Sequence, residues 1–489
     1  MPSTTTPNVL LIMTDQHRAD FTRGRGFPLD TMPFLDSLGR AGTVFGNAYT
    51  SAPLCVPARV SMLTGRFPSA HRVRQNSTGQ HALYGDDLLD VLRAAGYRLG
   101  FAGKPHIHRG LDDFDAHRGP YMHDGGTART ADDQAFDAWL HDLDHAVHPE
   151  PTPFPLERQL PYRITSDAMD VIDELGEDDP FFCWVSFPEP HNPYQVPEPY
   201  FSLFDEDEIP ERLAGPEALA GKGRTYRWLG DLIGTKRPGY DEAWRRYAAN
   251  YCGMLRLIDD QLRRLVGHLG DRARDTVIAF VSDHGDFVGE YGLQRKGAGM
   301  SEFLMRIPFQ LSGPGVRPGG VVAEPVSMVD LFPTLCELAG QDIPLGVQGR
   351  SLEPLLRGEP APAEEFTSVY GELGFGGVPY DDDERPPLHF PYDGATFDEL
   401  NTVTMSGGSR MVRAGRHKLV VDVDGNVELY DVEADPAELV DRAADPALAT
   451  VRDELLVWLA RWAIRAADDL PQGAYTSKTA PHNWRWARD

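Results

Sequence analysis

Acidic and imidazole side chains follow two short apolar segments of the sequence. Asp15 and Gln16 come after the first segment, and Asp283 and His284 come after the second. Open α/β sheets place their ligands at the carboxyl ends of strands, so these side chains can converge if the two strands are neighbours. A cavity with carboxylate oxygens and one imidazole suits a divalent cation such as calcium, magnesium or manganese. An Asp-His-Gly turn without metal is the alternative interpretation of the second segment.

A cysteine precedes a predicted helix in the segment 55–59 (CVPAR). Proline near the start of a helix has a favourable φ, so Cys55 is expected just before the helix N-terminus, in the field that favours anions. Arg59 follows one turn later and faces the same way, which suits a tetrahedral oxyanion. Taken alone, a cysteine in such a place is more often a buried thiol than a nucleophile.

The elements that carry these residues follow the α/β pattern, because short apolar runs alternate with longer amphipathic stretches through most of the chain. The runs predict buried strands at 9–13, 99–102, 181–186, 277–281 and 307–311, and helices at 86–95, 164–175, 242–269 and 329–339. The segments 113–163 and 188–240 are rich in proline, glycine and acidic residues. We expect these loop-rich segments to surround a site.

The last quarter of the chain has a different texture. Residues 371–398 indicate an irregular insertion, and the alternating segments 418–422 and 427–430 flank an Asp-Gly turn signal, which predicts a hairpin. A terminal helix is expected at 451–467. The predicted organisation is therefore a catalytic domain at 1–370, an insertion near the site at 371–404, and a C-terminal subdomain with a small antiparallel sheet and a helix at 405–489.

Composition excludes several classes of protein. The chain has 489 residues and a formal net charge of −27, which argues against binding to nucleic acid or to an anionic membrane. Its four cysteines cannot form a disulfide framework. The N-terminus has no basic region and only a short apolar run, so we expect a cytoplasmic protein.

The segment 55–66 (CVPARVSMLTGR) resembles the signature of the type I sulfatases, in which this cysteine is oxidised to formylglycine. Further segments resemble that family in its own order: 8–12 (NVLLI), 103–106 (GKPH), 190–193 (PHNP), 283–285 (DHG), 296–297 (KG), and C-terminal segments between 410 and 436. The resemblance extends from residue 8 to about residue 446. It implies an alkaline phosphatase-like fold with a large mixed, mostly parallel sheet flanked by helices.

The resemblance also implies an activity, the hydrolysis of a small-molecule sulfate monoester to an alcohol and inorganic sulfate. The nucleophile would be hydrated formylglycine at position 55, bound to one divalent cation, for which calcium is the first choice and manganese or magnesium the alternatives. The implied metal ligands are Asp15, Gln16, Cys55 in its modified form, Asp283 and His284. A formylglycine-generating maturation enzyme is the implied partner.

Other positions that match the family carry implied catalytic roles. Arg59 would support the diol, Lys104 and Lys296 would hold the sulfate oxygens, and His191, with Lys296, would protonate the leaving alcohol. His106 would take a proton from the second hydroxyl, so that sulfate is eliminated. Each side chain has a plain structural interpretation by itself, but their co-occurrence in order favours a site.

Two positions depart from the commonest sulfatase pattern. Gln16 stands where many members have aspartate, and His284 stands where many have asparagine. These residues, with Asn76 as a substrate-contacting asparagine, look more like the choline sulfatase and phosphonate monoester hydrolase branches. Hydrolysis of a phosphonate monoester or a phosphodiester is therefore the second hypothesis, and a non-catalytic member that binds an anion is the third. The C-terminal segment 483–486 (NWRW) could dock on a neighbouring subunit, which keeps a homo-oligomer as a hypothesis.

Overall fold

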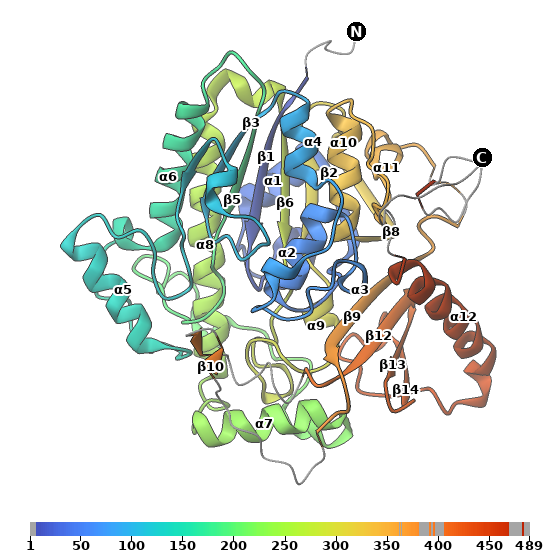
Figure 1. Cartoon of the computed structure of the whole chain (residues 1–489). Coiled ribbons are helices and arrows are strands. Elements are labelled where there is room, and N and C mark those ends of the chain that lie inside the picture. The colour runs from blue at the N-terminus through green and yellow to red at the C-terminus, as the bar shows by residue number, and fades with distance from the viewer. Residues whose placement is uncertain are drawn as a thin grey trace.

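A mixed eight-stranded sheet forms the centre of the molecule (Figure 1). The computed structural model describes residues 6–360, 362, 364–380, 391–392, 395–396, 405–468 and 482–483. In spatial order the strands are β4 (Ala116–Arg118), β3 (Arg98–Gly103), β5 (Phe181–Ser186), β1 (Asn8–Thr14), β6 (Thr276–Ser282), β7 (Phe309–Ser312), β2 (Gly42–Tyr49) and β8 (Gly320–Ser327). Strand β7 is antiparallel to β6 and β2, and the other neighbouring pairs are parallel. The expected mixed, mostly parallel sheet is confirmed.

The central strands are apolar along their whole length because both faces of the sheet are covered. Strands β1, β5 and β6 are buried almost throughout, which is the environment that produces continuous apolar runs rather than alternation. In the register of β1 against β6, Thr14 lies opposite Ser282. Both strands therefore end at the same edge, and Asp15 and Asp283 directly follow them there.

Helices pack on both faces of this sheet (Figure 1). One face carries α1 (Pro33–Ala41), α6 (Leu160–Leu175) and α8 (Trp244–His268), with α5 (Ala131–Leu143) and α7 (Arg224–Lys236) beyond them. The other face carries α2 (Cys55–Thr64), α4 (Leu88–Ala94), α10 (Leu331–Leu338) and α11 (Glu353–Arg357). The short helices α3 (Pro68–His71) and α9 (Glu302–Met305) belong to the segments that connect larger helices and strands. None of the helices in the described ranges is long and apolar enough to cross a membrane.

Two helices, α5 and α7, lie within the segments 113–163 and 188–240, which the sequence indicated to be rich in loops. Helix α5 begins at a capping box in which Thr130 accepts a hydrogen bond from the backbone N–H of Asp133. It buries Phe136 and Leu140 on one face. The aspartates of this helix gave the segment the composition of a loop, although the four-residue spacing of Phe136 and Leu140 indicates a helix.

The C-terminal subdomain contains an antiparallel sheet in the order β14 (Val427–Asp431), β13 (His417–Asp422), β12 (Gly407–Ala414), β9 (Ser368–Gly376), covered by α12 (Ala449–Ala466). The expected hairpin and terminal helix are present. The expected irregular insertion is corrected at its start, because β9 continues to Gly376 and pairs with β12. The glycines of this segment are atypical of a strand, so the sequence did not indicate one. Glycine at position 371 allows a close approach, because a Cβ there would lie 2.4 Å from the methyl group of Met305. Beyond it, β10 (Pro391–Tyr392) pairs with β11 (Ala395–Thr396), and the rest of 381–404 lies outside the described residues.

Replacing Asp330 with alanine should strongly destabilise the catalytic domain. Buried Asp330 accepts hydrogen bonds from the backbone N–H groups of Ser327 (2.8 Å) and Arg350 (2.7 Å), and it forms an ion pair with the Arg350 guanidinium at 3.1 Å. The variant leaves this buried guanidinium without its carboxylate partner, so we expect a loss of about 3–5 kcal/mol in the free energy of unfolding, measured in urea. The exposed Asp342→Ala control should change it by less than about 0.5 kcal/mol. Equal stability of the two variants would contradict this assignment.

Candidate active site

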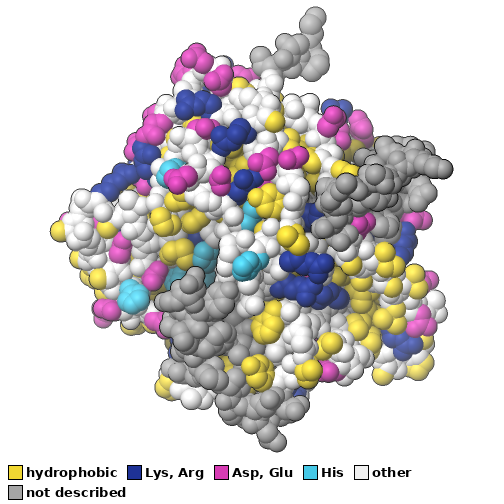
Figure 2. Space-filling view, in the orientation of Figure 1, with side chains coloured by type: hydrophobic (Ala, Val, Ile, Leu, Met, Phe, Trp, Pro, Cys, Tyr) yellow, Lys and Arg dark blue, Asp and Glu magenta, His cyan; other side chains and the backbone are white. Residues whose placement is uncertain are grey.

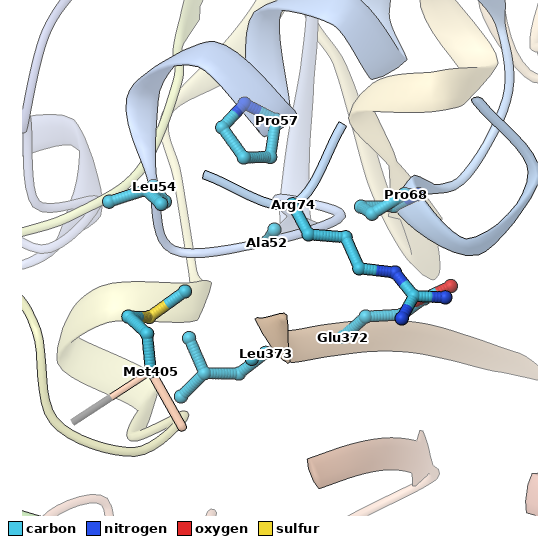
Figure 3. Close-up of a pocket in the computed structure, with 9 residues that line it drawn as sticks. Ala52, Leu54, Pro57, Pro68, Arg74, Glu372, Leu373 and Met405 are labelled. Carbon is cyan, nitrogen blue, oxygen red and sulfur yellow. The ribbon is translucent and has the colours of Figure 1, made fainter. Parts of the chain in front are cut away.

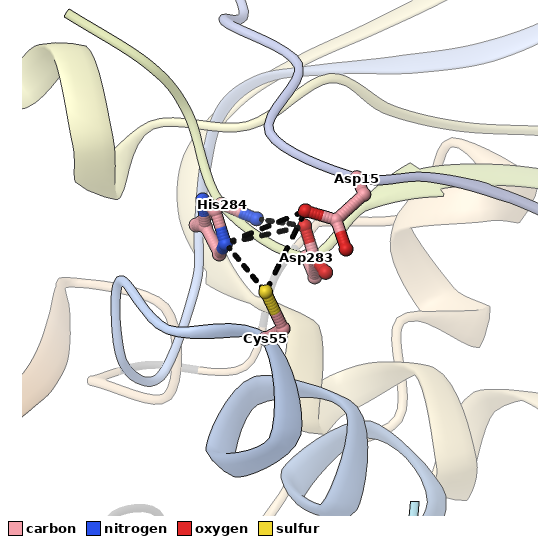
Figure 4. A group of neighbouring side chains, drawn as sticks. All are labelled: Asp15, Cys55, Asp283 and His284. Atoms are coloured by element: carbon pink, nitrogen blue, oxygen red, sulfur yellow. Dashed lines mark hydrogen bonds and ion pairs between the residues drawn. The ribbon is translucent and has the colours of Figure 1, made fainter. Parts of the chain in front are cut away.

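Four potential metal ligands converge at the edge where β1 and β6 end (Figure 4). Asp15 follows β1, Asp283 and His284 follow β6, and Cys55 is the first residue of α2. All four side chains are buried, and one ligand atom from each lies within 4.8 Å of all the others. The two strand ends therefore meet as the sequence predicted, and the cysteine comes to them from the N-terminus of a helix.

The imidazole of His284 has a fixed orientation. Its Nδ1 lies 2.9 Å from the carbonyl oxygen of Gly285, to which Nδ1–H donates. This hydrogen bond leaves the Nε2 lone pair directed at the cluster, 3.4 Å from the sulfur of Cys55 and 3.7 Å from Asp283 Oδ1. Gly285 permits the turn, since a Cβ there would lie 1.9 Å from the carbonyl oxygen of Phe303.

The donor set of this cluster fits a divalent cation. Two buried carboxylates and one imidazole nitrogen provide mainly hard oxygen ligands. Burial would lower the pKa of His284, but Asp283 and Cys55 together outweigh burial and raise it. The cluster thus attracts positive charge, which is the property that a cation site requires.

Arg59 lies behind the carboxylates rather than in front of the nucleophile. Its fully buried guanidinium donates from Nε to Asp283 Oδ2 (2.9 Å) and from a terminal nitrogen to Asp15 Oδ2 (3.0 Å). The other terminal nitrogen donates to the carbonyl oxygen of Lys104 (2.9 Å) and to Ser186 Oγ (2.8 Å). Because these bonds engage the Oδ2 atoms, the Oδ1 atoms of both carboxylates face Cys55 and His284. The sequence placed Arg59 beside the oxyanion, whereas the structure shows it orienting the two acidic side chains.

Lys104 contributes a second buried positive charge. Its Nζ lies 2.6 Å from Asp15 Oδ2. Burial alone would raise the pKa of Asp15, but Lys104 and Arg59 hold it well below its usual value. Burial would lower the pKa of Lys104, but the charge of Asp15 raises it. Both groups therefore stay charged.

His106 is suited to accept a proton. Burial, followed by the charge of Lys104, keeps its pKa well below the usual value, so the imidazole is neutral. Its Nδ1 is buried and has no hydrogen-bond partner in the part of the chain that the structure describes. An unpaired nitrogen on a neutral ring is available to a substrate or a water.

Lys296 and His191 form a hydrogen-bonded pair. Lys296 Nζ donates to His191 Nε2 at 3.0 Å and to Gln16 Oε1 at 2.9 Å. His191 Nδ1 lies 3.1 Å from the carbonyl oxygen of Asn192, so that nitrogen carries the ring proton. Burial and the charge of Lys296 lower the pKa of His191 well below the usual value. The imidazole of His191 is therefore neutral and accepts the hydrogen bond from Lys296 at Nε2.

Asn76 lies at the start of α2 beside an open hollow. Its Oδ1 accepts a hydrogen bond from the backbone N–H of Val56 (3.0 Å), one of the donors that the first turn of a helix leaves unpaired. The hollow is lined by Val56, Asn76, Gly79, Gln80 and the loop segment 105–110, which includes His106. This loop contains His106 and forms one wall of the hollow.

A smaller pocket lies under the same helix start (Figure 3). Leu54 and Pro57 line one side of it, and Leu373 and Met405 line another. Strand β9 and the residue that follows the insertion thus contact the segment that carries Cys55. On the face shown in Figure 2, histidine side chains gather near the middle, beside a group of basic side chains.

Several residues of the site were not identified from the sequence. Asp286 contacts Gln16, and its position directly after the DHG segment is a signal that could have revealed it. His123 packs against His191 with ring centroids 4.8 Å apart, and burial lowers its pKa to about 4. It comes from the loop after β4, and no spacing in the sequence connects it with the other histidines.

A buried carboxylate–imidazole–cysteine cluster at the strand ends of this sheet, surrounded by lysine and histidine, defines a hydrolase of the alkaline phosphatase superfamily. The sulfatase family model matches residues 7–341, and the chain belongs to that family. The protein is therefore an enzyme, a sulfuric ester hydrolase.

Similar proteins agree with this assignment. An arylsulfatase of Clostridium perfringens is 29% identical over 404 residues, covering 76% of this chain and 82% of that protein. A multifunctional alkaline phosphatase superfamily protein, PehA, of Trinickia caryophylli is 30% identical over 521 residues, covering 95% and 96%. The structure of a phosphonate monoester hydrolase of Agrobacterium radiobacter superposes with a TM-score of 0.80 at 24% identity, covering 98% of this chain and 100% of that one, which shows the shared fold.

Proposed function

We propose that the cluster at the ends of β1 and β6 cleaves a small-molecule sulfate monoester, with position 55 as the nucleophile. The observation that carries the proposal is the convergence of Asp15, Cys55, Asp283 and His284 within 4.8 Å in a buried site. Lys104 and Lys296 place positive charge beside this cluster, where both affect the ionisation of Cys55. These lysines provide the local attraction for an anion that the net charge of −27 opposes.

A divalent cation is the cofactor that we propose for this site. Asp15, Asp283 and His284 would hold it, with Gln16 as a neutral oxygen ligand. When bound, the cation supplies positive charge that stabilises an oxygen nucleophile and polarises the sulfate group. Calcium is the first choice because the ligands are mainly oxygens, and manganese or magnesium are the alternatives.

Conversion of Cys55 to formylglycine is the second part of the proposal. The modification would supply an aldehyde whose hydrate offers an oxygen nucleophile, and it requires an oxidising maturation enzyme. Burial and Asp15 oppose ionisation of the thiol, but the positive charges of Lys296, Lys104 and His284 together lower its pKa. Mass spectrometry of the peptide that contains Cys55, from protein made in its native cell, should find the aldehyde or its hydrate. An unmodified thiol throughout would contradict this part.

The surrounding residues would bind the substrate and move its protons. Lys104 and Lys296 would hold the sulfate oxygens as negative charge develops on them. The Lys296–His191 pair would give a proton to the departing alcohol oxygen, because Lys296 Nζ already donates a hydrogen bond to His191 Nε2. His106 is neutral and has an unpaired nitrogen, so it would accept the proton that is released at position 55.

Hydrolysis of phosphonate monoesters or phosphodiesters is the alternative function. Two observations favour keeping it: Gln16 makes the cation site less negative than two aspartates would, and the relative PehA is named multifunctional.

A comparison of kcat/KM on 4-nitrophenyl sulfate and on a phenyl phosphonate monoester separates the two functions. We expect the sulfate ester to be preferred by at least about 10-fold, a difference of about 1.4 kcal/mol in transition-state stabilisation. Both activities should disappear on removal of metal with a chelator and return on addition of calcium. A strong preference for the phosphonate would reverse the assignment.

A further inference from the structure

Asp286 is a buried carboxylate that has no part in the roles described above. Its Oδ2 accepts hydrogen bonds from Gln16 Nε2 (2.6 Å) and from the hydroxyl group of Tyr194 (3.0 Å). Its Oδ1 accepts from the backbone N–H of Val288 (2.8 Å) and from the hydroxyl group of Tyr247. Both oxygens are therefore held by fixed neighbours, and the carboxylate has a defined orientation inside the protein.

This carboxylate contacts one end of the Gln16 amide. Oδ2 of Asp286 accepts a hydrogen bond from Nε2 of Gln16 at 2.6 Å, so the NH2 group of the amide faces this carboxylate. The amide oxygen then lies on the opposite side, where it accepts a hydrogen bond from Lys296 Nζ at 2.9 Å. The two contacts agree independently, since an ammonium group can only donate.

The backbone of Gln16 is also held beside the cluster. Its N–H donates to Asp283 Oδ1 (3.0 Å), and its carbonyl oxygen accepts from the hydroxyl group of Tyr251 (2.7 Å). The residue has φ of +68°, in the left-handed region that a side chain other than glycine rarely adopts. Backbone strain of this kind persists where surrounding contacts impose it, and such positions concentrate at functional sites.

We propose that Asp286 is a positioning residue that keeps Oε1 of Gln16 turned toward the cation site and Lys296. The inference rests on the cation site of the proposed function. Without Asp286 the amide can rotate, and its NH2 group would then face both a cation and an ammonium group. With Asp286 in place, the site gains a neutral oxygen ligand and Lys296 keeps its acceptor.

Exchanging the amide group and the carboxylate group between positions 16 and 286 tests this inference. In the double variant Gln16→Glu/Asp286→Asn, the new asparagine NH2 can donate to the new glutamate, which leaves the other glutamate oxygen for the cation. Tyr194 now accepts from Gln16 and donates to Asp286, and in the double variant it can accept from the asparagine and donate to the glutamate. The exchange therefore reverses the polarity of every bond in this triangle without leaving one unpaired.

The measured quantity is the Kd for Ca²⁺ of the full-length protein, stripped of metal and titrated against a fluorescent chelator. We expect Asp286→Asn to raise Kd by about 10- to 100-fold, as losses of residues that orient metal ligands do. Gln16→Glu alone places two carboxylates side by side and should also weaken binding. The double variant should return to within about 3-fold of the wild type, a strong coupling between neighbours.

A buried aspartate elsewhere provides the matched control. Asp167 is also buried and accepts a hydrogen bond from a tyrosine hydroxyl group, that of Tyr121 at 2.8 Å. Asp167→Asn should alter the thermal midpoint without changing the Kd for Ca²⁺. Three results would each overturn the inference. The Kd of Asp286→Asn could equal that of the wild type, or the double variant could bind Ca²⁺ as weakly as the weaker-binding single variant. The third is that the wild type binds no Ca²⁺. Normal binding in the expected pattern together with no sulfate release would reject the proposed function alone.

Discussion

Replacing Cys55 with alanine is expected to abolish ester hydrolysis, with kcat/KM on 4-nitrophenyl sulfate falling by at least about 10⁴-fold. Position 55 holds the only nucleophile that the proposed mechanism uses. Its side chain lies 3.6 Å from Asp15 Oδ1 and 3.4 Å from His284 Nε2, at the centre of the converging ligands. Alanine has neither a thiol nor a group that could become an aldehyde, so the neighbouring lysines can bind the sulfate but cannot attack it.

Two controls separate loss of the nucleophile from damage to the fold. Cys336→Ala removes another buried thiol and should retain activity. Cys336 lies in α10, within the hydrophobic core on the face of the sheet that also carries α2. The Cys55→Ala protein should still bind Ca²⁺, because Asp15, Asp283 and His284 remain. Activity of Cys55→Ala within about 10-fold of the wild type would contradict the mechanism.

The location of the site could be predicted because it depends on strand order and on a few local patterns. The apolar runs before Asp15 and Asp283 identify strands, and parallel strands present their carboxyl ends at one edge. That β1 and β6 are neighbours is a property of the sheet, since 268 positions separate their paired residues Asn8 and Thr276. The resemblance at Cys55 supplied this missing information, because it joined the segments in one family.

The detailed roles of the side chains could not be predicted in the same way. The sequence indicated that Arg59 is one helical turn from Cys55 but not which neighbours its guanidinium contacts. Those partners come from β5 and from the segments that follow β1, β3 and β6, and only their packing brings them together. Asp286 and His123 were missed for a related reason, since burial and orientation decide their contacts.

The charges of the site explain how an acidic protein can bind an anion. Arg59, Lys104 and Lys296 lie around Asp15 and Asp283, so three positive charges are concentrated at the site. All five side chains are nearly inaccessible to solvent, where charge interactions are stronger than at the surface. The net charge of −27 is therefore a property of the rest of the molecule.

Replacing Arg59 with alanine should lower both the free energy of unfolding and the affinity for Ca²⁺, and we expect this effect to be second only to that of Cys55→Ala. The change leaves the Oδ2 atoms of Asp15 and Asp283 without their guanidinium partner in a buried site. We expect a loss of about 3–5 kcal/mol in the free energy of unfolding, as for other buried ion pairs that lose one member. The carboxylates also lose the contacts that direct their Oδ1 atoms at the cation, so the Kd for Ca²⁺ should rise by about 100-fold.

Arg350→Ala is the matched control, because it removes an equally buried guanidinium from the ion pair with Asp330, away from the ligand cluster. Both variants should unfold at lower urea concentrations, but only Arg59→Ala should weaken Ca²⁺ binding by the folded protein. Arg59→Lys discriminates further: one ammonium group keeps the charge but cannot reach both carboxylates in the fork geometry, so its Kd should lie between those of alanine and arginine. If Arg350→Ala weakened Ca²⁺ binding as much as Arg59→Ala, the effect would come from general destabilisation, and Arg59 would have no specific part in orienting the ligands.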